Sequence, residues 1–214
     1  MNDLATKLRL GIQQSHNTAE HSGFMTKVLQ GKAEKTLFTN LLSNLYFVYN
    51  QLETEINLHE DHPLLSRFNF KELKRTANLA EDLTFYYGSN WPEKLNPNQA
   101  AKSYISRIKE VSENEPILLI GHSYTRYMGD LSGGQGIRKI ARATFNLPEH
   151  EGTRFYEFDQ IGDIPSFKEQ YRQALNNLPL EEDIEDLIVK EANMSFNFNL
   201  SIMQEIEQSL AVAA

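Results

Sequence analysis

The stretch from His122 to Gly136 reads HSYTRYMGDLSGGQG and places four glycines within eight residues. Because each glycine inside a helix costs roughly 1 kcal/mol relative to alanine, we expect the helix predicted over residues 116–146 to break or kink between about 129 and 136. A backbone without side chains can lie flat against a planar ligand, and polar groups between the glycines can hold water. A flexible loop or a close helix crossing is the alternative explanation. The interleaved polar residues, which favour a ligand site, are Asp130, Ser132 and Gln135.

Helical periodicity extends outward from this stretch in both directions. Leu4, Leu8 and Ile12 recur every four residues and predict one apolar helix face. The same spacing continues to His16. Further helices are predicted over about residues 33–58, 71–87, 97–114, 165–177 and 181–211.

The composition fits a globular domain. The chain has 214 residues, of which 40% are hydrophobic and 23% charged, and it shows no internal repeat or low-complexity linker. Convincing strand alternation is lacking, and residues 154–158 are the only short strand candidate. We therefore expect an all-α fold in a single domain over residues 1–214.

Charge, cysteine content and hydropathy exclude several classes of protein. The formal net charge of −8 argues against a nucleic-acid partner. The absence of cysteine excludes disulfides, cysteine-ligated zinc and iron–sulfur clusters, and it suits a reducing compartment such as the cytoplasm. The longest apolar run, Ile117–Ile120, is far shorter than the roughly 20 residues of a transmembrane helix, and the N-terminus lacks the apolar core of a signal peptide. We expect no membrane association.

His16 ends the N-terminal apolar stripe. A lone histidine on an apolar helix face is usually a hydrogen-bonded core residue rather than a ligand. Glu20, however, lies one turn further along the same face, where its carboxylate can interact with the imidazole and fix a ligating tautomer. Spacing alone leaves both a core role and ligation of a metal centre open.

Lys168 and Arg172 form a basic i, i+4 pair late in the chain. Such pairs usually lie on a solvated helix face. They can also clamp carboxylates, because arginine supplies a planar fork of donors and lysine a point charge. The spacing does not decide between these two interpretations.

Common enzyme motifs are missing from the sequence. It contains no GxGxxG after a strand, no Walker loop, no HExxH and no GxSxG. The paired Glu-x-x-His motifs of carboxylate-bridged di-iron bundles are also missing. The cluster His59–His62 combines two histidines with two acidic residues, but it lies at a predicted helix end and is not expected to hold a metal.

The stretch HSYTRYMGDLSGGQ, from His122 to Gln135, closely resembles the distal-helix signature of haem oxygenases. The pattern is most similar to the cyanobacterial and plastid branch of that family, or to a phage-encoded relative. The resemblance implies a single-domain all-α fold that holds haem between a proximal N-terminal helix and the glycine-kinked distal helix. Four further blocks resemble the family in the same order: SHNTAEHSGFM (15–25), NLYFVYNQLETEI (44–56), EDLTFYYGSNW (81–91) and FKEQYRQALNNLP (167–179).

The resemblance implies that particular residues bind haem. His16 matches the proximal ligand of the haem iron, Glu20 lies beside it, and Thr125 belongs to the haem-contacting positions. The residues expected near the haem propionates are Arg9, Lys168, Arg172 and Tyr124. The expected pocket-lining positions are Met25, Val28, Phe196 and Asn199.

The resemblance also assigns the distal side. Gly129 and Gly133 match glycines whose backbone lies against the distal haem face. Asp130 matches the aspartate that orders distal water, assisted by Tyr49, and these four residues are the catalytic candidates. Gly136 stands where the family usually has an apolar residue, which predicts a looser distal helix.

The implied enzyme uses haem as both cofactor and substrate, with the iron bound through His16. With O₂ as co-substrate and electrons, it opens the ring to biliverdin IXα, CO and Fe²⁺, which supplies bilin pigment synthesis. The resemblance implies ferredoxin as the electron donor and a bilin reductase as a downstream partner. Candidates for docking the acidic donor are Arg138, Lys139 and Arg142, which follow the distal glycines, together with Lys168 and Arg172. The implied location is the cytoplasm, or the plastid stroma in a photosynthetic eukaryote.

Two other classes remain as alternatives on such a fold. A haem carrier or sensor would bind haem without opening it, and it would not need a distal proton-delivery group such as Asp130. A haem-oxygenase-like di-iron oxidase would need a carboxylate-rich ligand set on facing helices. The intact set from Gly129 to Gly133 favours the oxygenase.

Overall fold

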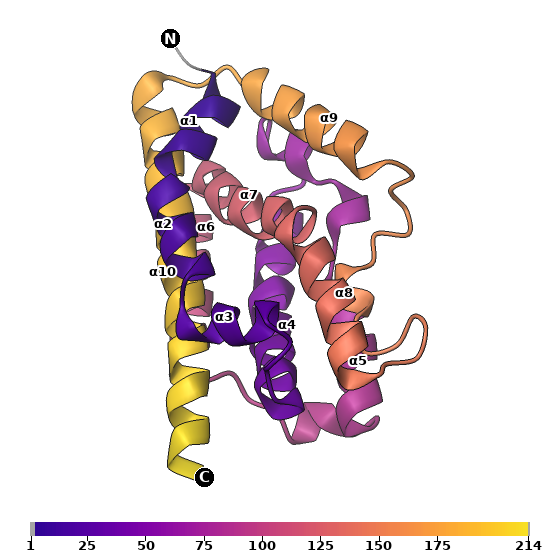
Figure 1. Cartoon of the computed structure of the whole chain (residues 1–214). Coiled ribbons are helices and arrows are strands. Elements are labelled where there is room, and N and C mark those ends of the chain that lie inside the picture. The colour runs from indigo at the N-terminus through magenta and orange to yellow at the C-terminus, as the bar shows by residue number, and fades with distance from the viewer. Residues whose placement is uncertain (1–2, 214) are drawn as a thin grey trace.

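A computed structural model describes residues 3–213, which form helices joined by turns and loops and contain no strand. The short helices α1 and α2 lie along the long C-terminal helix α10, while α7 and α8 run diagonally away from it (Figure 1). No helix of residues 3–213 is both long and apolar enough to cross a membrane. The α-helices are α1 (Leu4–Gly11), α2 (Gln13–Glu20), α3 (Gly23–Leu29), α4 (Lys35–Leu58), α5 (Thr76–Tyr87), α6 (Gln99–Asn114), α7 (Leu119–Asp130), α8 (Gly133–Phe145), α9 (Ile164–Asn176) and α10 (Glu182–Ala213). The 3₁₀ turns are η1 (Leu65–Phe68), η2 (Lys71–Leu73), η3 (Trp91–Glu93), η4 (Pro116–Leu118) and η5 (Arg154–Tyr156).

Side-chain caps set where helices begin. The carboxylate of Asp3 accepts a hydrogen bond from the backbone N–H of Thr6 at 2.8 Å and starts α1. Asn98 accepts from the N–H of Ala101 at 2.8 Å, so α6 begins after this cap and not at Pro97. Each cap satisfies a backbone donor that the first helical turn leaves without a partner.

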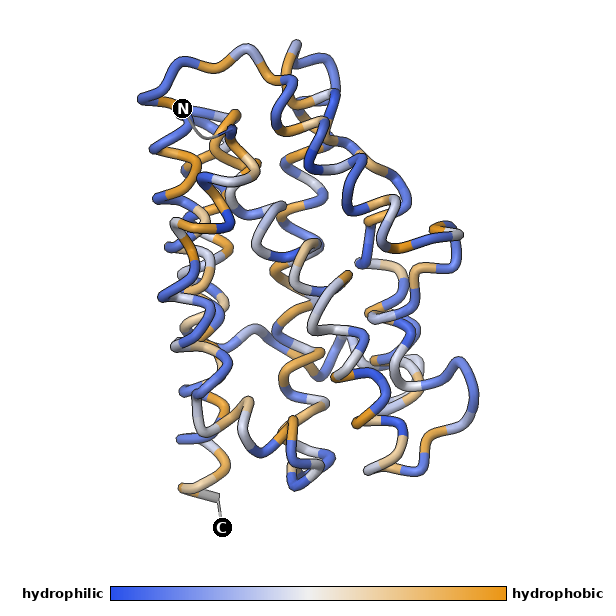
Figure 2. The backbone as a smooth tube through the Cα atoms, turned by 45° about the horizontal axis from the view of Figure 1, so that its top comes forward, coloured by the Kyte–Doolittle hydropathy of each residue, from blue (hydrophilic) through white to orange (hydrophobic). Residues whose placement is uncertain are grey.

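The buried apolar side chains form a continuous core between the helices. The long helix α4 contributes a stripe whose members Leu41, Leu45, Val48 and Leu52 are buried. Apolar and polar stretches alternate along the helical turns (Figure 2), as expected when one face of each helix packs inward. The helical period predicted for this segment is therefore confirmed.

The structure corrects three of the predicted elements. Residues 154–158, the strand candidate, begin with the 3₁₀ turn η5, because two of their N–H groups bind the carboxylate of Asp82 instead of a neighbouring strand. The N-terminal stripe is split at Ile12, which separates α1 from α2. The predicted helix over 71–87 starts with η2, and its α-helical part begins at Thr76.

The predicted break in the helix over residues 116–146 is confirmed. After η4, the chain forms α7 and α8, which are separated at Leu131 and Ser132. The backbone of Ser132 has φ −110° and ψ −91°, outside the α-helical region. The glycine-rich stretch thus ends one helix and starts another inside the predicted interval.

Gly121 allows α7 to cross α10 closely. A Cβ at this position would lie 2.7 Å from the carbonyl oxygen of Ile188 and 2.9 Å from the amide nitrogen of Ala192. Both of these are backbone atoms, which cannot move aside unless α10 shifts. Gly121 therefore sets the spacing of two helices that carry residues of the site described below.

Replacing Gly121 with alanine is expected to lower the free energy of unfolding by about 1–3 kcal/mol, because the added methyl group must displace the backbone of α10. Gly136→Ala is the matched control, since its Cβ would meet no atom within 4 Å. Inside α8 this control is expected to raise stability by up to about 1 kcal/mol. Urea unfolding followed by circular dichroism measures both changes. A Gly121→Ala protein as stable as the wild type would contradict the close crossing.

Candidate functional site

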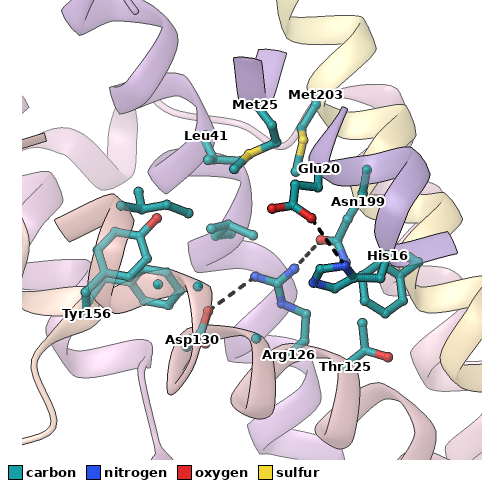
Figure 3. A pocket seen from close by; sticks show the side chains of 18 of the residues that line it. His16, Glu20, Met25, Leu41, Thr125, Arg126, Asp130, Tyr156, Asn199 and Met203 are labelled. Carbon is teal, nitrogen blue, oxygen red and sulfur yellow. Dashed lines mark hydrogen bonds and ion pairs between the residues drawn. The ribbon is translucent and has the colours of Figure 1, made fainter. Parts of the chain in front are cut away.

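A cleft opens between the N-terminal helices α2 and α3 and the broken pair α7 and α8 (Figure 3). Its empty volume is about 960 Å³, including its open mouth. The cavity itself accounts for about 200 Å³, and much of the remaining space is open to solvent. It is lined by His16, Ala19, Glu20, Met25, Leu29, Leu41, Leu45, Thr125, Arg126, Gly129, Asp130, Gly133, Gly134, Ile137, Phe155, Tyr156, Phe196, Asn199 and Met203.

His16 is an exposed wall residue of this cleft and not a core histidine. Its side chain is 53% exposed, and its Nδ1 lies 3.7 Å from a carboxylate oxygen of Glu20. The edge of the ring of Phe196 on α10 packs against the imidazole at a centroid distance of 5.9 Å. Figure 3 shows the imidazole directed into the cleft with Glu20 beside it. An imidazole placed in this way is free to ligate a metal centre through its other nitrogen.

Across the cleft, α7 and α8 present bare backbone. A Cβ placed on Gly129 or Gly133 would have no heavy atom within 4 Å, so both glycines border open space. Gly134 differs, because its Cβ would lie 2.9 Å from the ring of Tyr156. Two glycines therefore leave room for a ligand, while the third allows the broken helix to pack against the cleft wall.

A buried polar cluster lies beside the bare backbone. The hydroxyl of Tyr49 donates a hydrogen bond to the carboxylate of Asp130. The guanidinium of Arg126 donates to the Tyr49 hydroxyl at 3.1 Å and to Oδ1 of Asn199 at 2.5 Å, and it lies 3.8 Å from Oδ1 of Asp130. Helices α4, α7 and α10 thus each contribute to one network that ends on a carboxylate in the cleft.

Burial sets the charge behaviour of this cluster. It raises the pKa of Asp130 to about 6, against the opposing effects of Arg126 and Tyr49. Burial also raises the pKa of Tyr49 far above its usual value, so its hydroxyl keeps its proton and remains a donor. Although burial opposes it, the neighbouring Tyr49 and Asp130 raise the pKa of Arg126, which stays charged. Asp130 is therefore a carboxyl that exchanges its proton near neutral pH.

The residues expected to bind acidic groups, Arg9, Lys168, Arg172 and Tyr124, do not line the cleft. Lys168 of α9 donates from Nζ to Oγ of Ser132, at the helix break, at 2.7 Å. Arg172 pairs with the exposed Glu169. Burial raises the pKa of Tyr124, and the positive charges of Arg172 and Arg9 oppose that rise.

The structure places the predicted site residues unequally. Val28 lies outside the cleft, buried at a small separate cavity between α3 and α8 that Ile140 also lines. Tyr49 is buried and does not line the cleft, but its hydroxyl donates to the carboxylate of Asp130, which does. The predicted residues that line the cleft are His16, Glu20, Met25, Thr125, Gly129, Asp130, Gly133, Phe196 and Asn199.

Other lining residues were not assigned from the sequence. Arg126 stands just before the glycines, and its cation between Tyr124 and Tyr127 was a signal that could have found it. Leu41 and Leu45 have the same spacing as core residues of α4, so periodicity cannot separate them from the core. Phe155 and Tyr156 belong to an irregular segment whose position depends on tertiary contacts.

An exposed imidazole on one helix, a bare helix backbone across an apolar cleft and a buried carboxyl beside it define a helical protein suited to a flat, metal-containing ligand. The comparison with known families makes this class specific. The chain belongs to the haem oxygenase family, because the protein-family model described as Heme oxygenase matches residues 2–205. Haem oxygenase activity is the function of that family.

Relatives and solved structures agree with this assignment. The chain is 48% identical to Heme oxygenase 2 of Synechocystis sp., over 100% of this chain and 86% of the relative. It is 46% identical to Heme oxygenase 1 of Nostoc sp., over 99% and 89%. The fold is similar to the crystal structure of Synechocystis heme oxygenase-2 in complex with heme and NO, with a TM-score of 0.96, 47% identity, and coverage of 99% of this chain and 88% of that one. The expected all-helical haem oxygenase fold is confirmed.

Asp130→Asn is expected to gain stability relative to the wild type as the pH rises. The folded-state pKa of about 6 lies above the ordinary value of 3.8, so the native state holds this proton more tightly than the unfolded state. The stability that Asp130 contributes is therefore greatest below about pH 4 and falls as the pH rises through about 6. Asparagine does not titrate. The difference in unfolding free energy should shift in favour of the variant by on the order of 1 kcal/mol between about pH 5 and 8.

Urea unfolding of the two haem-free proteins at both pH values measures this difference. A difference that stays constant with pH would show that Asp130 titrates like an exposed aspartate.

Proposed function

We propose that this chain binds one haem in the cleft and opens its ring, with O₂ and electrons, to biliverdin IXα, CO and Fe²⁺. The observation that carries this proposal is the exposed imidazole of His16 across the cleft from the bare backbone of Gly129 and Gly133, next to the buried carboxyl of Asp130. The structure of Synechocystis heme oxygenase-1, 45% identical with a TM-score of 0.95, is described as a complex with heme. That likeness supports haem as the ligand here.

The residues present fit haem on each of its sides. The porphyrin needs apolar walls, and the cleft supplies Met25, Leu41, Leu45, Ile137 and Met203. The iron needs a nitrogen ligand, and the propionates need cations. When bound, the haem supplies the iron that activates O₂ and the ring carbon that is oxidised.

His16 is the proposed axial ligand. Its exposed ring has one nitrogen, Nδ1, turned toward Glu20, which leaves Nε2 for the iron. A carboxylate next to the non-ligating nitrogen holds the ring orientation and the tautomer that ligation requires. Glu20 is therefore proposed to orient His16.

On the opposite side, Gly129 and Gly133 leave the distal face of the ligand free of side chains. Asp130 is proposed to hold a water molecule there and to deliver its proton during O₂ activation. The Tyr49 hydroxyl takes up one carboxylate oxygen, and Arg126 lies close to the other, so the orientation of the carboxylate is determined before any ligand binds. Proton delivery depends first on such positioning and then on a pKa near the working pH.

Lys168, Arg172, Arg9 and Tyr124 are proposed to bind the haem propionates. Lys168 and Arg172 come from α9, Arg9 comes from α1 and Tyr124 comes from α7. In the structure Lys168 donates to Ser132, a contact it would exchange for a propionate. Charge-assisted contacts of this kind orient the ring as well as hold it.

Reduced ferredoxin is the proposed electron donor, because a small acidic iron–sulfur protein suits the basic residues near the cleft. Of the three candidates on α8, Arg138 already pairs with the buried Glu157 at 2.7 Å. Lys139 is exposed and Arg142 partly exposed, so these two and Lys168 are the better docking residues. We further propose that the product supplies bilin synthesis through a bilin reductase and that the reaction takes place in the cytoplasm or the plastid stroma.

The contacts of Asp130 favour an oxygenase over a haem carrier. Its carboxylate is bound by Tyr49 and approached by Arg126, and not by a backbone N–H at a helix end, so it does not serve as a helix cap. A carrier has no need for a buried acid held in this way. The di-iron alternative needs a carboxylate-rich ligand set, and residues 3–213 contain no group of three or more metal-binding side chains.

His16→Ala is expected to lose the native axial nitrogen ligand and haem breakdown, because no other imidazole lines the cleft among the described residues. His21→Ala is the matched control, since this exposed histidine at the end of α2 contacts the carbonyl of Asn17 and does not line the cleft. Resonance Raman spectroscopy of the ferrous haem complexes measures the iron–histidine stretch. An unchanged stretch in His16→Ala would rule out His16 as the ligand.

Asp130→Ala is expected to keep the axial histidine spectrum while its biliverdin formation falls by about 10²-fold or more, the usual contribution of a positioned acid. Turnover is measured with ascorbate and O₂, and separately with reduced ferredoxin, per haem-loaded molecule. This normalisation separates a chemical role from a loss of folded protein. Biliverdin formation close to the wild-type rate would remove Asp130 from the reaction.

A further inference from the structure

One wall of the cleft is an irregular backbone segment, Thr153–Phe158, here called the wall segment. Its residues Phe155 and Tyr156 line the cleft, although they come from the connection between α8 and α9. Only the single 3₁₀ turn η5 lies within it. A segment without a helix or a strand needs other groups to hold its backbone in place.

Two buried ionisable side chains supply these contacts: Asp82 lies within α5, and Arg75 directly precedes that helix. The carboxylate of Asp82, which is 0% exposed, accepts hydrogen bonds from the backbone N–H groups of Arg154 and Phe155, one on each oxygen, both at 2.8 Å. The guanidinium of Arg75 donates to the carbonyls of Phe155 and Glu157. Neither Asp82 nor Arg75 lines the cleft.

The wall segment is in turn connected to Asp130 by two routes. The ring of Phe155 packs edge-on against the ring of Tyr49 at 5.3 Å, and the Tyr49 hydroxyl binds the Asp130 carboxylate. The side-chain amide of Gln135 donates to the carbonyls of both Asp130 and Tyr156, at 3.2 and 3.0 Å. A shift of the wall segment would therefore displace the support of the carboxyl.

We propose that Asp82 is a positioning residue for Asp130: it fixes the wall segment, and Phe155 transmits that position to Tyr49 and the Asp130 carboxyl. Asp82 is suited to this task because two adjacent N–H donors need two acceptor oxygens. Asparagine at this position would offer one oxygen and would turn an NH₂ group toward the second donor. The predicted effect on haem breakdown rests on the proposed role of Asp130. The predicted effect of Asp82 on the position and pKa of the Asp130 carboxyl does not.

Asp82→Asn in the full chain tests the coupling. Hydrogen–deuterium exchange of the haem-free protein should become about tenfold faster or more at the amides of Arg154 and Phe155. Carboxyl ¹³C NMR should show the pKa of Asp130 falling by about 1 unit toward its ordinary value, because a loosened wall admits water. Haem breakdown per haem-loaded molecule should fall by about tenfold.

Asn98→Ala is the matched control. It also removes a side-chain acceptor from a backbone N–H, at the start of α6, which contributes no residue to the cleft. It should leave the pKa of Asp130 and the exchange of the wall segment unchanged. Faster exchange in Asp82→Asn without a change in the Asp130 pKa would overturn the proposal, because Asp82 would then be only a structural residue.

Phe155→Leu tests whether the contact between Phe155 and Tyr49 transmits the position of the wall segment. It provides an independent test if Asp82→Asn does not fold. This variant keeps the bonds of Asp82 but loses the contact with the Tyr49 ring, so the pKa of Asp130 should fall while the two amides stay protected. An unchanged pKa overturns the proposal. In the double variant, Asp82→Asn should add little further shift. A full additional shift would mean that the charge of Asp82 acts directly through space, which also overturns it.

The two proposals fail in different ways. If Asp130 is not the proton donor, Asp130→Ala and Asp82→Asn both keep normal turnover, while exchange and the pKa still respond to Asp82→Asn. If only the coupling is wrong, Asp130→Ala loses turnover, and the pKa of Asp130 is the same in Asp82→Asn as in the wild type.

Discussion

The break between α7 and α8 is the constraint on which the site depends. An unbroken helix would cover its cleft face with side chains, whereas the break and its two open glycines expose backbone to the ligand. The break also frees the carbonyl of Asp130 from a regular helical bond, and the amide of Gln135 takes it up. Ser132, at the break itself, is held by Lys168 from α9. The broken geometry is thus stabilised by side chains from the two following helices, α8 and α9.

Around this break, a small number of buried charges balance one another in a protein whose net charge is −8. Arg126 compensates Asp130 and keeps its own charge, while Tyr49 donates to the carboxylate that it supports. Desolvation alone would drive Asp130 toward its neutral form, and the opposing cation and hydroxyl keep its pKa at about 6. A carboxyl in this balance holds or releases a proton near neutral pH, which an exposed aspartate does not do.

The scaffold brings together residues that are distant in sequence. Ser15 of α2 bonds to Asn193 of α10 at 2.6 Å, so α10 positions the helix that carries His16. The same α10 contacts α7 through the close crossing at Gly121. Glu191 of α10 adds a buried contact to His122 and a paired contact to Arg107 of α6; although burial alone would raise its pKa, these two partners lower it to about 2. The long helix α10 therefore contacts both α2 and α7, which carry residues on the two faces of the cleft.

Local sequence was enough to predict most of the helices and the break in residues 129–136, because periodicity and glycine content act over a few neighbouring positions. The roles of His16 and Asp130 were implied by the family resemblance. Local sequence could not decide whether His16 was a core residue or an exposed cleft residue, since that depends on Phe196 and the opposite wall. The family resemblance placed Val28 in the pocket, residues 154–158 were the only short strand candidate, and nothing in the sequence gave a role to Asp82. Each of these depends on contacts between segments tens of residues apart. The two N–H groups that Asp82 binds belong to residues 154 and 155, and only the folded chain brings them together.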